Sequence, residues 1–460
     1  MSDLPTKLRE RFRKHGQDHV FTGWDQLDEE ERRAFVAQLE SLDLSELIAL
    51  YRRKDEAQTA LPPRERLAPL PVESGASILG ATIEKGEGAL RRGQVAVLLV
   101  AGGQGSRLGF EKPKGMYPVG PVSEASLFQL HAEKVLALSR RYGKPLPFLV
   151  MTSPATDAET RAFFKEHGDF GLNAEQVRFF QQGTMPALDL ATGRLLLEKP
   201  GSLFLSPNGH GGTLTALADS GLLAELRAQG VRHVFYFQVD NSLVNIADPA
   251  FVGRHIEIES EASSKVVFKE LAEEKVGVLA LIDGKCGIVE YSDMPAEMSN
   301  EKLPSGELAF RAGNPAIHLF SVEFLARVTS GADRLAFHIA RKKVPYYDAE
   351  ARATVEPTTE NALKFETFVF DALPMAKRWL AVSVRREEEF APLKNATGTD
   401  SSETVRRLQL DKAVRWLRAA GRKIPDDAVV EIGPLFALDA EELAKKLPQD
   451  WHYVEPTVLR

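Results

Sequence analysis

The spacing of apolar residues changes along the chain, and the first stretch has the spacing of helices. From Leu4 to about Glu56, apolar residues recur largely every three or four positions, as at Phe35 and Leu39, among many charges. This spacing predicts short amphipathic helices. The run LPPRERLAPLPVES follows, and its paired prolines exclude continued helix. We therefore predict a helical preface that ends in a linker, with a domain boundary near residues 80–92.

From residue 95 the apolar pattern becomes one of short, continuous, β-branched and aromatic runs. These runs are VAVLLVA, PFLVMT, VRHVFYFQVDN and VGVLALI, and they alternate with helical stretches such as SLFQLHAEKVLALSRRYG and LTALADSGLLAELRAQG. Strands that are apolar throughout are buried on both faces, which is typical of a parallel sheet covered by helices. The pattern predicts an α/β domain of the doubly wound, Rossmann-like kind with a mostly parallel central sheet.

Past residue 385 the chain becomes strongly charged and then returns to a brief strand pattern, AVVEIGPLFAL, and a last helix at DAEELAKKL. We predict a small C-terminal domain there. The expected organisation is a helical N-terminal region and Pro-rich linker over residues 1–90, a catalytic domain over 91–385, and the C-terminal domain over 386–460.

Composition narrows the classes of partner. The chain has 460 residues, of which 43% are hydrophobic, and 58 Lys and Arg against 65 Asp and Glu give a net charge of −7. There is no basic excess that would bind nucleic acid or an anionic membrane. Cys286 is the only cysteine, which fits a reducing cytoplasm. The charged N-terminus and the short apolar stretch at Val95 to Ala101 predict neither an export signal nor a membrane anchor.

The segment VAVLLVAGGQGSRLGFEKPKGMYPVG carries the clearest chemistry. A buried strand runs directly into Gly102, Gly103 and Gly105, where the missing Cβ atoms let backbone N–H groups approach an anion and accept positive φ. The glycine spacing fits neither the dinucleotide fingerprint nor the P-loop. Arg107 and Lys114 add cationic charge beside the turn. The segment therefore predicts a polyphosphate site, although a bare glycine turn is often only a connection between a strand and a helix.

Two further strand ends carry polar groups. VFYFQVDN places Asp240 at the end of an apolar strand, where open α/β sheets bind ligands and where a carboxylate suits Mg²⁺. An Asx cap that closes the strand is the alternative. FFQQG ends another strand with two amides, which can both donate to and accept from one edge of a base.

The chain resembles the type-1 UDP-sugar pyrophosphorylases, and specifically the eukaryotic-type UDP-N-acetylglucosamine pyrophosphorylases. The glycine-rich segment is the first of eight motifs that recur in order between about residues 95 and 400. The other seven are FFQQGTMPAL, PNGHGGTLTAL, QVDNSLVNIADPAF, VGVLALIDGKCGIVEYSD, FRAGNPAIHLF, LKFETFVFD and EFAPLKNATG. The resemblance implies a uridylyltransferase on a nucleotidyltransferase fold, which makes a UDP-sugar and pyrophosphate from UTP and a sugar 1-phosphate.

The resemblance also implies roles for single residues. It implies phosphate contacts for Arg107, Lys114 and Lys394, a nucleotide site formed by Gly102, Gly103, Gln182, Gly209 and His210, and a Mg²⁺ site at Asp240. For the sugar phosphate it implies Gly277, Glu290, Asn314 and Lys364, with Phe368 and Phe370 on one face of a strand and one of them beside the N-acetyl group. Taken alone, most of these residues are caps, turns, core or surface positions.

One residue departs from the acetylglucosamine branch. His210 stands where those enzymes usually carry Asn, whereas glucose and broad-specificity enzymes tend to have His. Because Asn314 and the two phenylalanines match the acetylglucosamine branch, we expect N-acetylglucosamine 1-phosphate as the preferred sugar phosphate. Glucose 1-phosphate or broad specificity is the alternative.

Two other classes of protein remain as alternatives. A nicotinamide or flavin enzyme on a Rossmann domain is disfavoured by the glycine spacing, and a relative that only binds a nucleotide is disfavoured by Arg107, Lys114, Asp240 and Lys394. Relatives can associate through the C-terminal region, which is short in this chain, so we expect a monomer.

Overall fold

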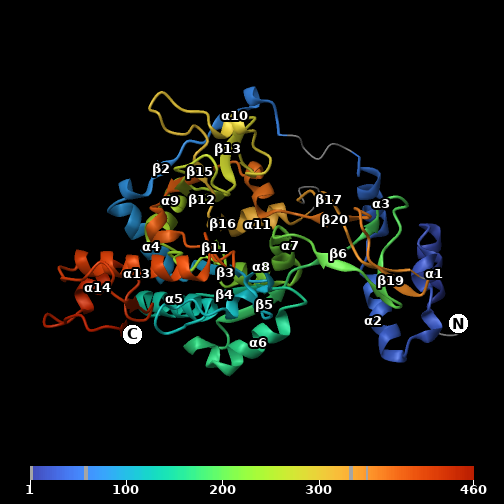
Figure 1. Ribbon diagram of the computed structural model, residues 1–460, viewed down its shortest axis with the longest axis horizontal. Coiled ribbons are helices and arrows are strands. Elements are labelled where there is room, and N and C mark those ends of the chain that lie inside the picture. Colours follow the sequence, from blue (N-terminus) through green and yellow to red (C-terminus); the bar gives the residue numbers. More distant parts are fainter. Residues whose placement is uncertain (1–3, 56–60, 331–334, 349–350) are drawn as a thin grey trace. The chain divides into compact units, whose positions relative to one another are not determined.

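The computed structural model describes residues 4–55, 61–330, 335–348 and 351–460 (Figure 1). Contacts between residues divide the chain into two compact units. Unit 1 consists of residues 1–60, 183–212 and 335–369, and unit 2 consists of residues 61–182, 213–334 and 370–460. The predicted boundaries at residues 90 and 385 concern consecutive segments and stay a prediction. Glu56, the expected end of the preface, lies outside the described residues.

Unit 1 begins with the predicted helical preface, which is confirmed. Its helices are α1 (Thr6–Lys14), α2 (Glu29–Glu40) and α3 (Leu44–Arg52). Asp28 caps α2 in a reciprocal capping box with Glu31, and Asp43 caps α3 through two backbone N–H groups. These caps satisfy backbone donors that the first helical turn leaves without a partner.

The apolar faces of these helices pack against chain from much later in the sequence. Phe12, Trp24 and Phe35 share one apolar core with Leu363 and Phe365. The later stretches form small sheets from β6 (Thr184–Pro186), β7 (Leu188–Asp189), β8 (Leu197–Lys199), β9 (Ser202–Leu203), β10 (Leu205–Pro207), β17 (His338–Lys342), β18 (Tyr346–Asp348), β19 (Ala353–Val355) and β20 (Ala362–Glu366). Unit 1 is therefore complete only when all three of its stretches are present.

Unit 2 is built on a mixed sheet of twelve strands whose main path runs β1-β13-β15-β12-β16-β11-β3-β4-β5. The neighbours β11, β3, β4 and β5 are all parallel, whereas β16 is antiparallel to both β11 and β12. The bounds are β1 (Leu67–Pro69), β2 (Glu73–Ser74), β3 (Val95–Val100), β4 (Phe148–Thr152), β5 (Val177–Gln181), β11 (His233–Gln238), β12 (Ala262–Phe268), β13 (Val278–Ile282), β14 (Lys285–Val289), β15 (Ala312–Gly313), β16 (His318–Ser321) and β21 (Trp379–Ser383).

The four apolar runs of the sequence become β3, β4, β11 and β13, so their prediction as strands is confirmed. The α/β class and a largely parallel central sheet also hold, while the doubly wound description stays a prediction. The Pro-rich run contributes more than a linker, because β1 pairs with β13 and β2 pairs with β21. Both are short strands, as expected where prolines remove backbone donors.

The helices of unit 2 are α4 (Ala81–Arg91), α5 (Leu127–Tyr142), α6 (Asp157–Glu166), α7 (Gly212–Asp219), α8 (Leu222–Ala228), α9 (Pro249–Glu257), α10 (Ala296–Ser299), α11 (Val322–Val328), α12 (Arg386–Glu389), α13 (Ser402–Ala419) and α14 (Ala440–Lys446), with α7 starting one residue before the second stretch of the unit. The stretch at residues 214–230, predicted as one helical region, divides into α7 and α8.

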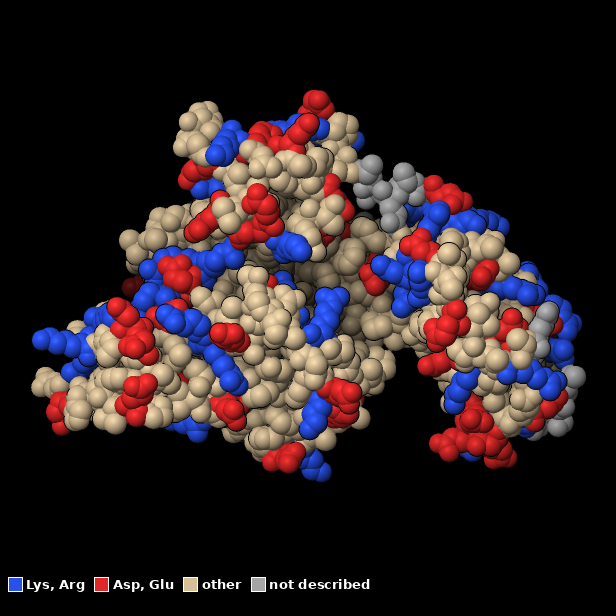
Figure 2. All heavy atoms as spheres, viewed as in Figure 1, with Lys and Arg blue, Asp and Glu red and all other residues tan. Residues whose placement is uncertain are grey.

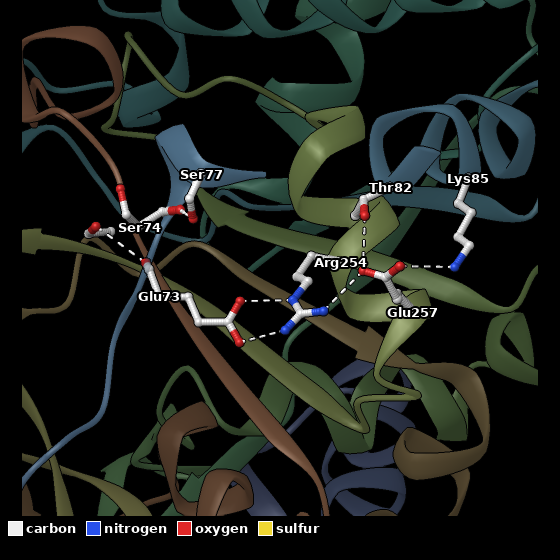
Figure 3. A network of polar contacts seen from close by, with 8 residues as sticks. Glu73, Ser74, Ser77, Thr82, Lys85, Arg254 and Glu257 are labelled. Atoms are coloured by element: carbon white, nitrogen blue, oxygen red, sulfur yellow. Dashed lines mark hydrogen bonds and ion pairs between the residues drawn. The ribbon is translucent and has the colours of Figure 1, made fainter. Parts of the chain in front are cut away.

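Helices α4 and α9 cross unusually closely. A Cβ at Gly86 would lie 1.9 Å from the carbonyl oxygen of Pro249, and a Cβ at Gly253 would lie 1.8 Å from that of Thr82. Only glycine permits this approach. Beside the crossing, Arg254 donates to Glu73 of β2 and to Glu257, which also accepts from Lys85 (Figure 3).

The C-terminal region adds α13, α14 and a parallel pair, β22 (Val430–Ile432) with β23 (Thr457–Leu459), around an apolar cluster of its own. Lysine and arginine are mixed with aspartate and glutamate over the face drawn in Figure 2, and no field of one sign stands out there. Among the described helices, none is both long and apolar enough to span a bilayer.

Candidate active site

The glycine-rich turn follows the carboxyl end of β3, a central strand of the sheet. A Cβ on Gly103 would meet no atom within 4 Å, whereas one on Gly102 would lie 3.2 Å from Oε1 of Gln182. Ser153, just after β4, donates its hydroxyl to the carbonyl of Gly102 at 2.8 Å. The turn therefore leaves open space at Gly103 and holds the Gln182 amide beside Gly102.

This turn does not use the positive φ that its glycines permit. Gly102, Gly103 and Gly105 have no left-handed backbone, and only Gly109 of this segment has φ near +68°. Close packing explains Gly105 instead, because a Cβ there would lie 2.7 Å from the carbonyl oxygen of Phe110.

Lys114 is brought back over the turn. Its backbone N–H donates to the carbonyl of Gly103 at 3.0 Å, and its Nζ donates to the carbonyl of Leu393 at 3.4 Å. The next residue must be small, since a Cβ at Gly115 would lie 2.2 Å from the ring of Phe128. Lys114 is therefore fixed between the glycine turn and the residue before Lys394.

Arg107 lies on a short 3-10 turn, Ser106–Leu108, and is exposed. Within the described part of the chain it has no ion pair. The structure therefore leaves its guanidinium available to an anionic ligand but does not join it to Lys114.

Asp240 stands two residues beyond β11, as predicted from the strand pattern. Its side chain is 9% exposed, and its backbone carbonyl accepts the N–H of Leu393 at 3.0 Å. The next residue, Asn241, donates to the carbonyl of Glu389 at 2.8 Å and accepts the N–H of Ala391 at 3.0 Å. These bonds tie the Asp240 segment to residues 389–393.

The same ties bring Lys394 to Asp240, together with a carboxylate that sequence reasoning missed. The backbone N–H of Lys394 donates to the carbonyl of Asp400 at 2.7 Å. Burial raises the pKa of Asp400, Lys394 opposes that shift, and the charge of Asp240 adds to it. No signal in the sequence near Asp240 pointed to Asp400, because the two residues meet only through the fold.

The predicted sugar residues Gly277, Glu290 and Asn314 also come together. A Cβ on Gly277 would lie 3.2 Å from Oε1 of Glu290, and the Asn314 N–H donates to the Gly277 carbonyl at 2.8 Å. Burial raises the pKa of Glu290, aided by Asp293 and opposed by Lys394. Glu290 therefore shares the electrostatic surroundings of Lys394. The oxygen of Asn314 accepts the N–H of Ala316 in a tight turn, which leaves its amide donors for a ligand.

Unit 1 holds a second group of predicted residues. The ring centroids of His210 and Phe368 lie 5.2 Å apart, and Nδ1 of His210 accepts the N–H of Val369 at 3.2 Å. Gly209 has φ near +81°, and a Cβ there would lie 2.3 Å from the carbonyl of Thr367. Lys364 lies 5.2 Å above the ring of Phe204, and burial lowers its pKa.

The expectation that Phe368 and Phe370 share one face of a strand is wrong. β20 ends at Glu366, and a 3-10 helix covers Val369–Met375. Thr367 leaves the ladder because its N–H and hydroxyl both donate to the carbonyl of Asn208. Phe368 belongs to unit 1 and Phe370 to unit 2.

A buried charge network, also missed from the sequence, lies behind Asp240. Lys265 on β12 is fully buried, and its Nζ lies 2.6 Å from Glu389 and 3.0 Å from Asp248. Both carboxylates raise the pKa of Lys265 against the effect of burial. The one available signal was a lysine inside the apolar run ASSKVVF. The network fixes the start of the segment that reaches Lys394.

The residues at this edge fit a divalent cation that substrate phosphates help to bind. Among the described residues, no group of three or more carboxylate, histidine or cysteine side chains forms a closed metal cage. Mg²⁺ uses one or two carboxylates and keeps waters and phosphates as its other ligands. Asp240, at a strand end with Asp400 nearby, matches that pattern.

The arrangement as a whole suits an anionic nucleotide. Gly103, Gln182 and Asp240 follow the parallel strands β3, β5 and β11, and Lys114 and Leu393 are bonded to the backbones of Gly103 and Asp240. Ligands bind at the carboxyl ends of the strands in open α/β sheets. Positioned cations at the edge would stabilise charge that develops on phosphate oxygens.

Comparison with known proteins identifies relatives of the chain over nearly its whole length. The family model described as UTP–glucose-1-phosphate uridylyltransferase matches residues 56–448. The chain is 38% identical to the UDP-N-acetylhexosamine pyrophosphorylase-like protein 1 of Xenopus tropicalis, over 95% of this chain and 92% of that protein. It is 35% identical to the UDP-N-acetylglucosamine pyrophosphorylase of Saccharomyces cerevisiae (strain ATCC 204508 / S288c), over 96% of this chain and 97% of the yeast protein.

A solved structure of a related enzyme has the same fold over the whole chain. The crystal structure of the uridine diphosphate N-acetylglucosamine pyrophosphorylase from Trypanosoma brucei in complex with an inhibitor superposes with a TM-score of 0.82 and 29% sequence identity. The match covers 100% of this chain and 99% of the trypanosome chain.

Proposed function

Because the chain belongs to the UTP–glucose-1-phosphate uridylyltransferase family, it is a UTP:sugar-1-phosphate uridylyltransferase, and we propose that it makes UDP-N-acetylglucosamine and pyrophosphate from UTP and N-acetylglucosamine 1-phosphate. The observation that carries the proposal is a chain of contacts within unit 2. Lys114 bonds to the glycine turn and to Leu393, Leu393 bonds to Asp240, and the next residue, Lys394, interacts with Glu290. One end of this series of contacts suits a triphosphate and the other suits a sugar.

Lys114 and Arg107 act at the polyphosphate end. The Lys114 ammonium has one bond, to the Leu393 carbonyl, and its remaining N–H groups can donate to phosphate oxygens. Arg107 supplies a second cation from the exposed side of the turn. Together they stabilise the triphosphate and then the departing pyrophosphate.

The nucleotide base lies beside Gln182, whose side-chain amide reads its edge through one donor and one acceptor. Gln182 is 8% exposed, and its backbone N–H donates to the carbonyl of Thr152 at 2.7 Å. The backbone that carries the side-chain amide is therefore held in place before a ligand arrives. Gly102 and Gly103 give the nucleotide close access to the backbone. The nucleotide-binding turn that the resemblance implies at Gly209 and His210, in unit 1, stays a prediction.

The sugar phosphate enters from the Glu290 end. Lys394 binds its phosphate, while Gly277, Glu290 and Asn314 hold the hexose. The roles that the resemblance implies for Lys364, Phe368 and Phe370 stay predictions. A phosphate oxygen of the sugar attacks the α-phosphorus of UTP in line, and the bond to pyrophosphate breaks. That oxygen is already ionised at neutral pH, so positioning and charge perform the catalysis without a general base.

Asp240 would hold Mg²⁺, which supplies charge neutralisation between phosphates when it is bound. The backbone of Asp240 is held by Leu393, and its neighbour Asn241 is held by residues 389 and 391. The fold therefore fixes this carboxylate beside Lys394.

Comparison of two sugar phosphates tests the proposal directly. Pyrophosphate release from UTP should show a higher kcat/KM with N-acetylglucosamine 1-phosphate than with glucose 1-phosphate, by about tenfold to two-hundredfold, the value of one apolar group in a pocket. A ratio that favours glucose 1-phosphate would overturn the sugar assignment and leave the uridylyl transfer standing. No release with either sugar would overturn the proposed reaction.

His210 is the single observation for the alternative, a glucose or broad-specificity enzyme. Its Nδ1 is engaged by the Val369 N–H, so it fixes the turn before Phe368. A His210→Asn variant that keeps the same sugar ratio would show that this residue does not set the preference.

We also propose that the protein is a monomer and that it is located in the cytoplasm. Light scattering of the full chain measures its mass against the 50.8 kDa of one copy, and cell fractionation tests the compartment. Cys286 is buried and burial raises the pKa of its thiol to about 12, so it is not a reactive thiol.

A further inference from the structure

Unit 2 contains a cavity of about 250 Å³ whose lining residues do not include the residues assigned to the active site. Its walls come from α5, from residues 242–249 just after Asp240, and from the C-terminal region between α13 and Asp439. The C-terminal region, to which the reaction gives no role, forms one whole side of it.

The cavity is lined mostly by apolar side chains, with a few charged side chains among them. Leu130, Leu138, Ile246 and Ala413 supply apolar surface, and Trp416 supplies an aromatic ring. Lys134 and Lys412 supply two amino groups. Asp248, Glu431 and Asp439 also line the cavity, and each is bonded within the protein, to Lys265, to the backbone of residues 122–123 and to Arg141, respectively. Such a mixture of mostly apolar lining and a few placed polar groups is typical of small-molecule sites.

Neither lysine has a carboxylate at ion-pair distance within the described residues. Nζ of Lys134 donates to the carbonyls of Ser242 at 2.6 Å and Val244 at 2.9 Å. Nζ of Lys412 donates to the Glu388 carbonyl at 2.7 Å and lies 4.8 Å above the ring of Trp416. Burial lowers the pKa of Lys134 and that of Lys412, the latter to about 8, and an anion bound beside them would oppose both shifts. Both ammonium groups keep N–H donors that no backbone carbonyl uses.

A third group at the wall has no partner at all among the described residues. Ser242 is 3% exposed, and its Oγ is buried without a hydrogen bond. Buried hydroxyl groups are nearly always paired in native proteins, so an unpaired one at a cavity wall points to a ligand.

We propose that this cavity is a second ligand site, for a small molecule with a carboxylate or phosphate head and an apolar or aromatic body. The head binds Lys134, Lys412 and the Ser242 hydroxyl, and the body packs against Trp416 and the leucines of α5. Binding itself does not depend on the proposed function. Its effect on turnover does.

The same two lysines hold the segments that carry the active-site charges, so the ligand acts on the active site. Lys134 binds residues 242 and 244, and His131, one turn earlier on α5, bonds to the Val239 carbonyl at 2.9 Å, so Asp240 lies between these anchors. Lys412 and the Trp416 indole N–H bind Glu388, six residues before Lys394. A ligand that binds either lysine competes with the hydrogen bonds that the lysine makes to these segments, and so changes their position.

Calorimetry with the full chain tests the site. The probes are phenylacetate and phenyl phosphate, with neutral phenylacetamide as the matched control for charge. At least one anion should bind about tenfold more tightly than the amide, the value of hydrogen bonds to charged groups. Saturating UTP should leave that binding in place. Equal binding of all three probes, or displacement by UTP, would overturn the site.

Variants separate the cavity from surface effects. Lys412→Met should weaken the anion about tenfold or more, whereas Lys445→Met, at an exposed position on α14, should leave it unchanged. If Lys412→Met does not fold, Leu438→Trp fills the cavity from its wall and should abolish binding. Unchanged affinity in Lys412→Met, or in Leu438→Trp, would overturn the proposal.

The bound anion should change kcat or KM of uridylyl transfer in the wild type and not in Lys412→Met. Binding without any change in turnover would overturn the link to the active site. Absence of turnover with intact binding would instead count against the proposed function, so the two failures can be told apart.

Discussion

Unit 2 contains two sets of charged side chains that are held in opposite ways. At the carboxyl ends of the parallel strands, neither Lys114 nor Asp240 forms an ion pair within the described part of the chain, and the backbones of both are hydrogen-bonded. Behind them, Lys265 is fully buried between Asp248 and Glu389. The first set is held by the main chain and kept open, whereas the second is satisfied internally.

The difference separates the two uses of charge in one fold. A charge that must meet a ligand cannot be neutralised by the protein beforehand, so the fold positions it through hydrogen bonds of the backbone. A charge that is neutralised by the protein holds segments together instead. Substitution at the edge should therefore reduce activity, and substitution in the buried set should reduce stability.

The largest effect is expected at Asp240. Asp240→Ala should abolish turnover and flatten the response to Mg²⁺, because a metal contributes several kcal/mol to phosphate chemistry. Its melting temperature should stay close to that of the wild type, since the backbone bonds remain. The measurement is activity against Mg²⁺ concentration, with Asp219→Ala at an exposed site as the control. An unchanged Mg²⁺ response would move the metal site elsewhere.

Removal of the buried cation tests the other half of the comparison. Lys265→Met leaves two carboxylates buried without a cation and should lower the free energy of unfolding by about 3–5 kcal/mol. Urea titration measures it, with Lys285→Met, at the exposed first residue of β14, as the matched control. The same substitution in a Glu389→Gln background should cost less. If it cost as much there, the pair would not be coupled.

Lys114 should show the reverse behaviour, with a smaller effect than Asp240. Lys114→Ala removes one electrostatic partner of the polyphosphate and should reduce kcat about a hundredfold or more, while the unfolding transition stays unchanged. Lys112→Ala, two residues away and exposed, serves as the control. Near-normal turnover in Lys114→Ala would remove this residue from the phosphate site.

The smallest effect is expected at the surface network of Arg254. Its hydrogen bonds lower the pKa of Glu73, and bonds from Lys85, Thr82 and Arg254 lower that of Glu257 to about 2 (Figure 3). Carboxylates with lowered pKa stabilise the fold above their ordinary value near 4.5, and this stabilisation is lost as pH falls toward the folded value.

The stability difference between the wild type and Arg254→Ala should therefore shrink between about pH 5 and pH 2. At neutral pH it should be small, as expected for exposed pairs that water screens. Urea titrations at several pH values measure it. A difference that grew on acidification would contradict the assigned network.

Sequence reasoning found those parts of the site that depend on local pattern. An apolar run followed by Asp240 places a carboxylate at a strand end, as the structure confirms, and the glycine turn with Lys114 predicts a phosphate loop. Asp400 and the bonds that Asn241 makes to residues 389 and 391 were missed, because only the fold brings residues 389–400 to Asp240.

The misread elements fail for the same physical reason. Residues 367–370 alternate like a strand, but Thr367 bonds to Asn208, from a distant turn, and the ladder stops. The antiparallel strand β16 inside the sheet and the pairing of the Pro-rich run with β13 are likewise set by tertiary contacts. Local pattern fixes which residues are strands more reliably than it fixes their neighbours.

The three separate stretches of unit 1 have a consequence for synthesis on the ribosome. The helices of residues 6–52 share a core with Leu363 and Phe365, which are translated more than three hundred positions later. At about 5–20 residues per second, their apolar faces wait roughly 15 to 60 seconds for that cover. The nascent N-terminus is thus an exposed client for chaperones during most of translation, and slow codons after residue 52 would lengthen that exposure.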